Sequence, residues 1–150
     1  MSASDAEIYQ KHRDDLIKYA TALVGRDDAA DIVSTVVLRV LARGSLADLR
    51  EPRPYLFRAV LNEARSTLRR RRPVWSTPPT GDAELDIRPE VVRAVLNLPT
   101  RQRAATYLVY WESLSIGEAA ELMGAQPGTV KRYLHLARNR LRGTLSEHPD

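Results

Sequence analysis

The chain has 150 residues, 43% of them hydrophobic, which fits one ordinary domain or two very small ones, and its formal net charge of +4 favours a polyanionic partner. It has no cysteine and only three scattered histidines, which excludes disulfides and thiolate zinc sites, so no metal or other cofactor is expected. No apolar run reaches the length of a membrane span and the first residues lack a signal-peptide pattern, so we expect a cytoplasmic protein.

A first helix is predicted for residues 4–24. Ser4 and Glu7 have the spacing of a capping box, and apolar residues follow at helical spacing until Gly25. The apolar residues of this helix are Ile8, Leu16, Tyr19 and Leu23.

A second helix is predicted for residues 27–43, which begin with two aspartates and end before Gly44. Carboxylates at a helix start suit the positive end of its dipole. Two apolar stripes run side by side along this helix, one made of Ile32, Val36 and Val40, the other of Val33, Val37 and Leu41. A helix that is apolar around so much of its circumference is either sandwiched within its own domain or docked against a partner.

Residues 43–53 contain glycine and proline and are predicted to form a loop, after which Pro54 fits the first position of a third helix. The buried face of this helix is predicted to comprise Phe57, Leu61, Ala64 and Leu68. The opposite face carries an aromatic ring, an amide and three guanidiniums in one line: Tyr55, Arg58, Asn62, Arg65 and Arg69. Such a line can be a solvated arginine face. The interleaved tyrosine and asparagine favour nucleic acid, because rings stack on bases and amides hydrogen-bond their edges.

The sequence changes character between residues 73 and 88. This stretch is rich in proline, carries more acidic than basic residues and has little periodicity, as expected of a flexible linker. It divides the chain into residues 1–72 and 89–145, each too short to bury a deep core. The predicted fold class is therefore all-α, with two small helical domains joined by a linker.

The second half is predicted to contain four helices, of which the first begins at Pro89 and the second at Thr100. The inward face of the second of these is predicted to be Ala104, Leu108 and Trp111.

The last two predicted helices form a recognisable pair. Ser115 and Glu118 have the spacing of a capping box, Gly124 ends the short helix that follows, and Pro127 starts a longer basic one. A short helix, a glycine turn and a longer basic helix are the pattern of a DNA-binding helix-turn-helix motif.

The longer helix of this pair is the predicted recognition helix, with its amino-terminal turns in the major groove. Its polar residues fall into two predicted groups. Candidates for base or nearby phosphate contact are Lys131, Arg132 and His135, with Thr129 suited to a phosphate. Candidates for backbone contact, or for a solvated position, are Arg138, Arg140 and Arg142.

Three segments occur in a fixed order: "DDAADIVSTVVLRVLAR", "RPYLFRAVLNEARSTLRRRR" and "LNLPTRQRAATYLVYWESLSIGEAAELMGAQPGTVKRYLHLARNRLR". In this order they resemble regions 2 and 4 of the extracytoplasmic-function group of bacterial sigma-70 factors. The last segment is the most specific, because leucine-proline, "RQR" and "GTVK" fall at the spacing of that family. The resemblance implies two helical domains, one that reads the promoter minus-10 element and assists strand opening, and one that reads the minus-35 element.

The resemblance also implies roles for particular residues. In that family the segment matching the second helix docks on the clamp helices of the largest polymerase subunit, which implies polymerase contacts at Asp31, Val33, Val37 and Arg39, with ordinary core positions as the alternative for the valines. Residues 43–53 match the loop that captures a flipped minus-10 base. The residues that match or flank the strand-reading surface are Tyr55, Arg58, Asn62, Arg65 and Arg69.

The partners implied by the resemblance are core RNA polymerase, through its clamp helices and its flap, and promoter DNA. An anti-sigma protein commonly holds members of this family, and a free member is expected to be a monomer without enzymatic activity. The chain departs from the family pattern at Ser34 and Thr35, where glutamine and glutamate are usual, and at Leu41, where an aromatic is usual. We therefore expect an altered polymerase contact. Gln126 replaces the usual serine or threonine cap of the recognition helix.

Two other functions fit parts of the sequence. A dimeric transcription regulator would share the helix-turn-helix but would need a ligand or phosphoacceptor domain in place of residues 1–72. A DNA-processing enzyme could hold Mg²⁺ on Asp27, Asp28 and Asp31, yet carboxylates at a helix start commonly serve the dipole, and no base or nucleophile accompanies them.

Overall fold

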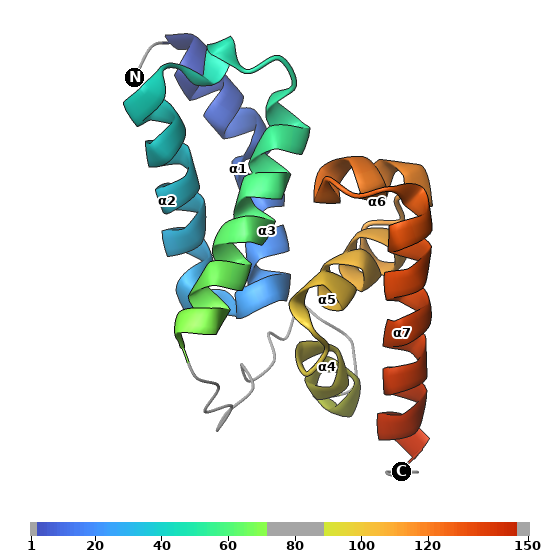
Figure 1. The fold of residues 1–150 in the computed structure, drawn as a ribbon. Coiled ribbons are helices and arrows are strands. Elements are labelled where there is room, and N and C mark those ends of the chain that lie inside the picture. The colour runs from blue at the N-terminus through green and yellow to red at the C-terminus, as the bar shows by residue number, and fades with distance from the viewer. Residues whose placement is uncertain (1–2, 72–88, 147–150) are drawn as a thin grey trace.

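The computed structural model of the protein describes residues 3–71 and 89–146, and helices make up most of both ranges (Figure 1). Within them there are seven α-helices, one short 3-10 helix and one π-helix, and no strand. The predicted all-α class is confirmed. The predicted linker, residues 73–88, lies outside the described residues.

The first half is a bundle of three helices, α1 (Ala3–Val24), α2 (Arg26–Arg43) and α3 (Pro52–Arg70). Their apolar faces meet in a core whose most buried members include Leu16, Tyr19, Leu23, Val33, Leu56 and Val60. α3 begins two residues earlier than predicted, because Pro52 and Pro54 both fit the first turn, where a helix needs no backbone N–H.

The start of α1 differs from the predicted capping box. Ser4 lies inside the first turn, and the buried carboxylate of Asp5 turns to the connection between α2 and α3. Its Oδ1 accepts hydrogen bonds from the Ser45 hydroxyl at 2.5 Å and from the Leu46 amide at 2.7 Å. These bonds fix a short 3-10 helix, η1 (Leu46–Asp48), so the predicted loop is partly ordered and tied to α1.

The second half contains α4 (Pro89–Leu96), α5 (Thr100–Thr106), α6 (Ile116–Met123) and α7 (Pro127–Ser146). The capping box predicted for α6 is present: the Glu118 amide donates to Ser115 Oγ and the Ser115 amide to Glu118 Oε1, both at 3.0 Å. The hydrogen bonds from Ser115 hold the pKa of Glu118 below its usual value. Gly124 then ends α6 with a φ of 67°, in the left-handed region. The predicted helix-turn-helix is formed by α6 and α7.

One predicted core residue of the second half lies elsewhere. Trp111 was expected inward with Leu108, but it is 47% exposed whereas Leu108 is buried. The cause is a π-helix, η2 (Tyr107–Trp111), in which the Glu112 amide donates to Tyr107 O at 3.0 Å, five residues back. Such a turn is wider than an α-turn, so the α-helical spacing that paired Trp111 with Leu108 no longer applies.

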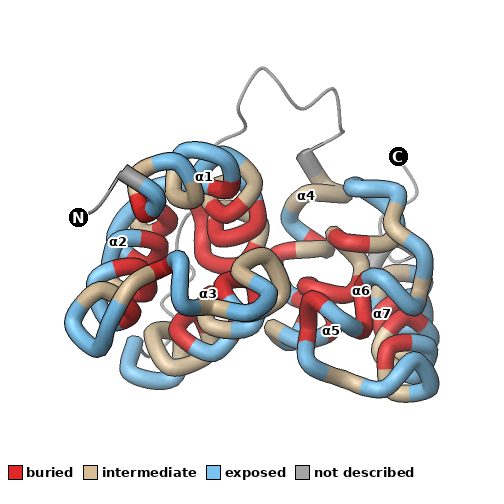
Figure 2. The backbone as a smooth tube through the Cα atoms, turned by 90° about the horizontal axis from the view of Figure 1, so that it is seen from above, coloured by how far each residue is buried: buried red, intermediate tan, exposed pale blue. Residues whose placement is uncertain are grey.

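The two halves share one core. Buried residues of α1, α2 and α3 belong to the same apolar cluster as buried residues of α5, α6 and α7. The ring of Tyr19 lies 4.9 Å from that of Phe57 in its own half and 6.0 Å from that of Tyr107 in the other. Figure 2 shows buried segments on the sides where the halves meet. The contact supplies burial that each half is too small to provide alone.

Candidate nucleic-acid interface

The polar line predicted on the third helix is present on α3. Tyr55, Arg58, Asn62 and Arg69 are exposed, and Arg65 is partly buried. Burial, followed by the neighbouring positive charges of Arg101 and Arg69, lowers the pKa of Arg65. Arg58, on the same line, donates from Nε to Glu121 O of α6 at 3.0 Å, so the line on α3 faces the second half of the chain and not only solvent.

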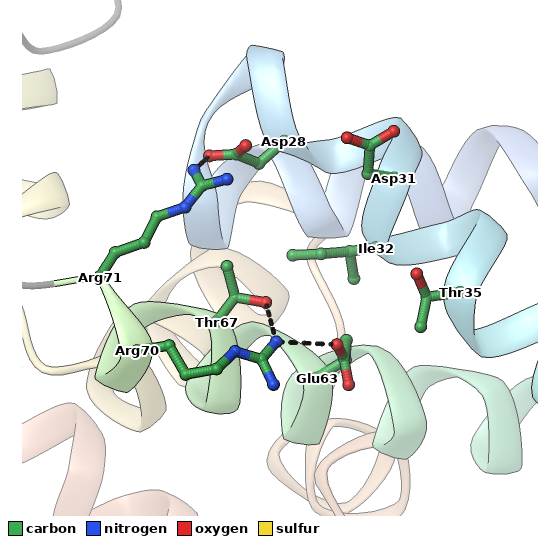
Figure 3. Close-up of a pocket in the computed structure, with 8 residues that line it drawn as sticks. All are labelled: Asp28, Asp31, Ile32, Thr35, Glu63, Thr67, Arg70 and Arg71. Atoms are coloured by element: carbon green, nitrogen blue, oxygen red, sulfur yellow. Dashed lines mark hydrogen bonds and ion pairs between the residues drawn. The ribbon is translucent and has the colours of Figure 1, made fainter.

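The arginine run at the end of α3 is partly neutralised within the protein. Figure 3 shows Arg70 and Arg71 at an open cleft between α2 and α3. Arg71 pairs with Asp28 of α2, and Arg70 NH2 lies 3.4 Å from Glu63 Oε1. Glu63 is only 7% exposed, and it also accepts a hydrogen bond from Arg39 NH1 at 2.7 Å. Ion pairs between α2 and α3 therefore neutralise part of this positive charge and hold the two helices together.

The recognition helix α7 presents a continuous cationic row. Its apolar residues Val130, Leu134 and Ala137 are buried. On the outside, the predicted contact residues Lys131, Arg132, His135 and Arg138 are exposed, and Thr129 is partly buried at the start of the helix. The amides of Thr129 and Val130 donate to Gln126 O at 3.0 and 3.1 Å, so the helix begins regularly despite the weak cap at Gln126. This row is suited to phosphates and base edges of duplex DNA.

A residue that the sequence analysis missed lies beside this row. Tyr110 of η2 is exposed, and its hydroxyl accepts a hydrogen bond from Arg138 NH2 at 2.6 Å. The bond holds the Arg138 side chain against the body of the second half. The contact between Tyr110 and Arg138 does not follow from their spacing in the sequence, because the π-helix sets the position of Tyr110.

Family models match both halves of the chain: "Sigma-70 region 2" matches residues 8–74, and "Sigma-70, region 4" matches residues 88–141. The chain is 34% identical to the RNA polymerase sigma-E factor of Streptomyces avermitilis, over 93% of this chain and 83% of that one. It is 30% identical to the ECF RNA polymerase sigma factor SigM of Mycobacterium tuberculosis, over 90% of this chain and 74% of that one.

The chain belongs to the extracytoplasmic-function sigma-70 factors. Two solved structures have the same fold. One, described as the sigma factor RpoE in complex with the anti-sigma factor NepR from Bartonella quintana, has a TM-score of 0.72 at 24% identity and covers 97% of this chain and 98% of its own. Another, CnrH in complex with the cytosolic domain of CnrY, has a TM-score of 0.67 at 24% identity, over 95% and 88% of the two chains.

The outer face of α2 in this sigma factor differs from the one expected for polymerase contact. Asp31 and Arg39 are exposed as a contact surface requires. Val33 and Val37 are 1% and 6% exposed, so both valines belong to the core of the bundle and we leave them out of the proposed contact. The exposed apolar residue is Leu38, at 64%. Leu38 belongs to neither of the two apolar stripes predicted for this helix. An apolar residue outside the stripes is the signal that could have identified it as exposed.

A buried arginine marks the "RQR" motif of this sigma factor. Arg103 of α5 is 3% exposed, and its NH2 donates to Leu96 O at 2.6 Å and to Leu98 O at 2.8 Å. Its NH1 donates to Leu23 O at the end of α1 in the first half. Burial lowers the pKa of Arg103 to about 10, so the side chain is a cation at neutral pH.

The acidic start of α2 does not form a metal site in the described structure. Asp28 is paired with Arg71. Between residues 3 and 71 and between 89 and 146, no group of three or more His, Asp or Glu side chains is arranged to hold a metal ion. In these two ranges, no helix has the length and apolar character to span a membrane.

Proposed function

We propose that this sigma factor recruits core RNA polymerase through the exposed face of α2 and directs it to promoters with two recognition elements. In this proposal residues 1–72 act at the minus-10 element and residues 89–145 at the minus-35 element, with residues 73–88 as the linker. The observation that carries the proposal is the exposed cationic row of α7, which follows a glycine turn in a chain that matches both sigma regions. Nucleotide addition stays with the polymerase, and we assign no catalytic residue or cofactor to this chain.

On the minus-10 side, the proposed contact residues are Tyr55, Arg58, Asn62, Arg65 and Arg69. α3 presents a ring, guanidiniums and an amide along one line, which is exposed except at the partly buried Arg65. These groups can stack on separated bases and bind their phosphates. The nearby η1 is anchored by Asp5, which gives the proposed base-capturing loop a rigid support. Flipping a base costs a few kcal/mol, which contacts between the base and the loop must offset. A loop that is already ordered loses less conformational entropy when it forms these contacts.

On the minus-35 side, the proposed contacts are Thr129, Lys131, Arg132, His135 and Arg138. The polymerase contact is proposed for Asp31, Leu38 and Arg39 on the outer face of α2, where an exposed leucine between charged residues fits the interface of a protein partner. An anti-sigma protein is a further proposed partner. It is supported by one of the similar solved structures, in which a sigma factor is in complex with the anti-sigma factor NepR.

Run-off transcription tests the proposed function. Purified chain and core polymerase are incubated with a genomic fragment library, and the transcripts are mapped. We expect initiation at asymmetric sites with two conserved elements. The double variant Lys131→Ala, Arg132→Ala should lose about tenfold or more in promoter affinity, because each base contact contributes ~1–3 kcal/mol. The double variant Lys11→Ala, Lys18→Ala, which removes two exposed positive charges of α1 outside the proposed contacts, serves as the matched control.

The same experiment separates the sigma-factor proposal from its alternative. A regulator acting without polymerase would protect a palindromic site by itself and would give no polymerase-dependent transcript. That result would contradict the proposed function.

A further inference from the structure

One buried carboxylate of α3 holds an arginine of the proposed polymerase surface and an arginine of the run that ends α3. Glu63 is 7% exposed and lines the cleft between α2 and α3. Its Oε2 accepts a hydrogen bond from Arg39 NH1 at 2.7 Å, and its Oε1 accepts one from Arg70 NH2 at 3.4 Å. Figure 3 shows Glu63 and Arg70 at this cleft. The proposed function assigns no role to Glu63.

The burial of Glu63 accounts for its two cationic partners. A carboxylate that is taken out of water loses its hydration, and cations or hydrogen-bond donors must replace it. The arginines themselves stay largely in solvent, because the side chain of Arg39 is 62% exposed and that of Arg70 is 65% exposed. Each guanidinium can therefore meet a second anion on its outer side.

The contact with Arg39 orders a side chain of the proposed polymerase surface. A free arginine loses rotamer freedom when a partner binds it, and this loss weakens the association. In the folded chain NH1 of Arg39 is already held by Glu63 Oε2. A guanidinium has five N–H donors, so the donors that face solvent remain available to a carboxylate or carbonyl of the polymerase.

The contact with Arg70 acts in the opposite direction on DNA binding. Arg70 NH2 lies 3.5 Å from Thr67 Oγ1 as well as 3.4 Å from Glu63 Oε1, and both acceptors line the cleft (Figure 3). These bonds draw the guanidinium toward the cleft. A phosphate that binds Arg70 must first replace the carboxylate, so this arginine contributes less to DNA binding than an unpaired one.

We propose that Glu63 is a positioning residue with two effects: it orders Arg39 for core polymerase, and it withholds Arg70 from the DNA phosphates. This inference rests on the proposed function and names the side chain that sets two of its contacts. Loss of the carboxylate weakens the first interaction and strengthens the second. A general loss of stability weakens both, so the two explanations give different results.

Glu63→Gln tests the effect on Arg39, because it keeps the size of the side chain and removes its charge. We expect the affinity of the full chain for core polymerase to fall about three- to tenfold, since one more side chain must be ordered on binding. In an Arg39→Ala background the same substitution should have no effect, as a double-mutant cycle would measure. Glu7→Gln, at an exposed position of α1, makes the same change in net charge and serves as the matched control.

The salt dependence of DNA binding tests the effect on Arg70. Holoenzyme formed with saturating chain is titrated on promoter DNA at several KCl concentrations. For Glu63→Gln the slope of log affinity against log salt should increase in magnitude by up to ~0.9, the value for one duplex phosphate contact. In an Arg70→Gln background Glu63→Gln should leave the slope unchanged.

A measurement on the free chain requires neither polymerase nor DNA. In nitrogen-15 NMR spectra of the arginine side chains, the guanidinium of Arg39 should rotate slowly in the wild type and in Arg70→Gln, and fast in Glu63→Gln. Fast rotation in the wild type would contradict the ordering of Arg39.

Two results of the binding experiments overturn the inference. One is a polymerase affinity that does not change with Glu63→Gln, or that falls equally in the wild-type and Arg39→Ala backgrounds. The other is an unchanged salt slope for Glu63→Gln. Failure of the proposed function looks different, because then the wild-type chain neither binds core polymerase nor gives a promoter-directed transcript, while the NMR measurement still reports the contact of Glu63 with Arg39.

Discussion

At the scale of single residues, several polar side chains do structural work that their residue types alone do not reveal. Asp5 anchors η1, Glu63 joins two arginines, and Tyr110 holds Arg138. Except for the pair of Glu63 with Arg70 within α3, each of these bonds links segments that are distant in sequence. They position surfaces proposed to bind DNA or polymerase. Tyr110 and the buried His12 lead to the residue-scale predictions.

Tyr110 is expected to act as a positioning residue for Arg138. Tyr110→Phe keeps the ring but removes the hydroxyl that accepts from Arg138 NH2. One hydrogen bond contributes ~0.5–1.5 kcal/mol, so the affinity of holoenzyme for a minus-35 duplex should fall about three- to tenfold. In an Arg138→Ala background the same change should have no effect, as a double-mutant cycle would measure. Equal losses in both backgrounds would assign Tyr110 a role independent of Arg138.

His12 is expected to make the stability of the protein depend on pH. The side chain is 7% exposed, and burial, followed by the positive charges of Lys11 and Arg53, lowers its pKa, while Asp15 opposes the shift. Below the unfolded-state value of 6.5, the unfolded chain then binds more protons than the folded one, so the free energy of unfolding falls as the pH drops through this window.

Urea denaturation between about pH 7.5 and 5.5 measures this dependence. His12→Gln should flatten it, because the titrating group is gone. His135→Gln, which removes an exposed histidine, should retain the wild-type dependence. An identical pH profile for wild type and His12→Gln would show that another group is responsible.

At the scale of elements, the helices could be largely predicted because their signals are local. Capping residues, glycines and apolar periodicity lie within a few residues of the boundaries that they set, as at Ser115 and Gly124. The errors also have local causes. Two prolines fit the first turn of α3, and a π-turn changed the direction of Trp111. For Val33 and Val37, the sequence left core and partner contact open, and only packing decided between them.

The contacts between elements could not be predicted in the same way. Arg58 and Glu121 are 63 positions apart, and Arg103 and Leu23 are 80 apart. In both pairs the acceptor is a backbone carbonyl, which every residue has, so no pattern of residue types marks it. The ion pair between Arg71 and Asp28 could not be predicted from the sequence either. It changes how much the arginine run at the end of α3 is expected to contribute to DNA binding.

Within that run, the arginines are expected to contribute unequally to DNA binding. Arg69→Gln should lower the slope of log affinity against log salt by ~0.9 if its side chain contacts a duplex phosphate. The double variant Arg70→Gln, Arg71→Gln should lower the slope by less than the ~1.8 expected for two phosphate contacts, because Glu63 and Asp28 already pair with these guanidiniums. Titrations of holoenzyme on promoter DNA at several KCl concentrations give both slopes. A full decrease for the double variant would mean that both ion pairs open on DNA.

At the scale of the whole molecule, we expect the shared burial to make the two halves unfold as one cooperative unit. Neither half encloses a large core alone, and the residues between them contribute to a single apolar cluster. Arg103 takes part in this contact, because it donates to backbone carbonyls of both halves.

Arg103 is expected to couple the unfolding of the two halves. Arg103→Ala removes a buried cation and leaves carbonyls of Leu23, Leu96 and Leu98 without this donor. The free energy of unfolding should fall by about 3 kcal/mol, since buried polar groups that lose their partner are costly. Hydrogen exchange measured by mass spectrometry should show peptides of α1 and α5 opening together in the wild type, and α1 opening separately in the variant.

Arg101→Ala, an exposed neighbour on the same helix, should leave exchange in α1 unchanged and so controls for the loss of charge. If Arg103→Ala lowers protection in α5 alone, the arginine supports only its own half. Faster exchange in α1 as well requires that the contact with Leu23 stabilises the first half from across the interface. Because hydrogen exchange reports the opening free energy of each segment, its change in α1 measures how much the contact of Arg103 with Leu23 contributes to the first half.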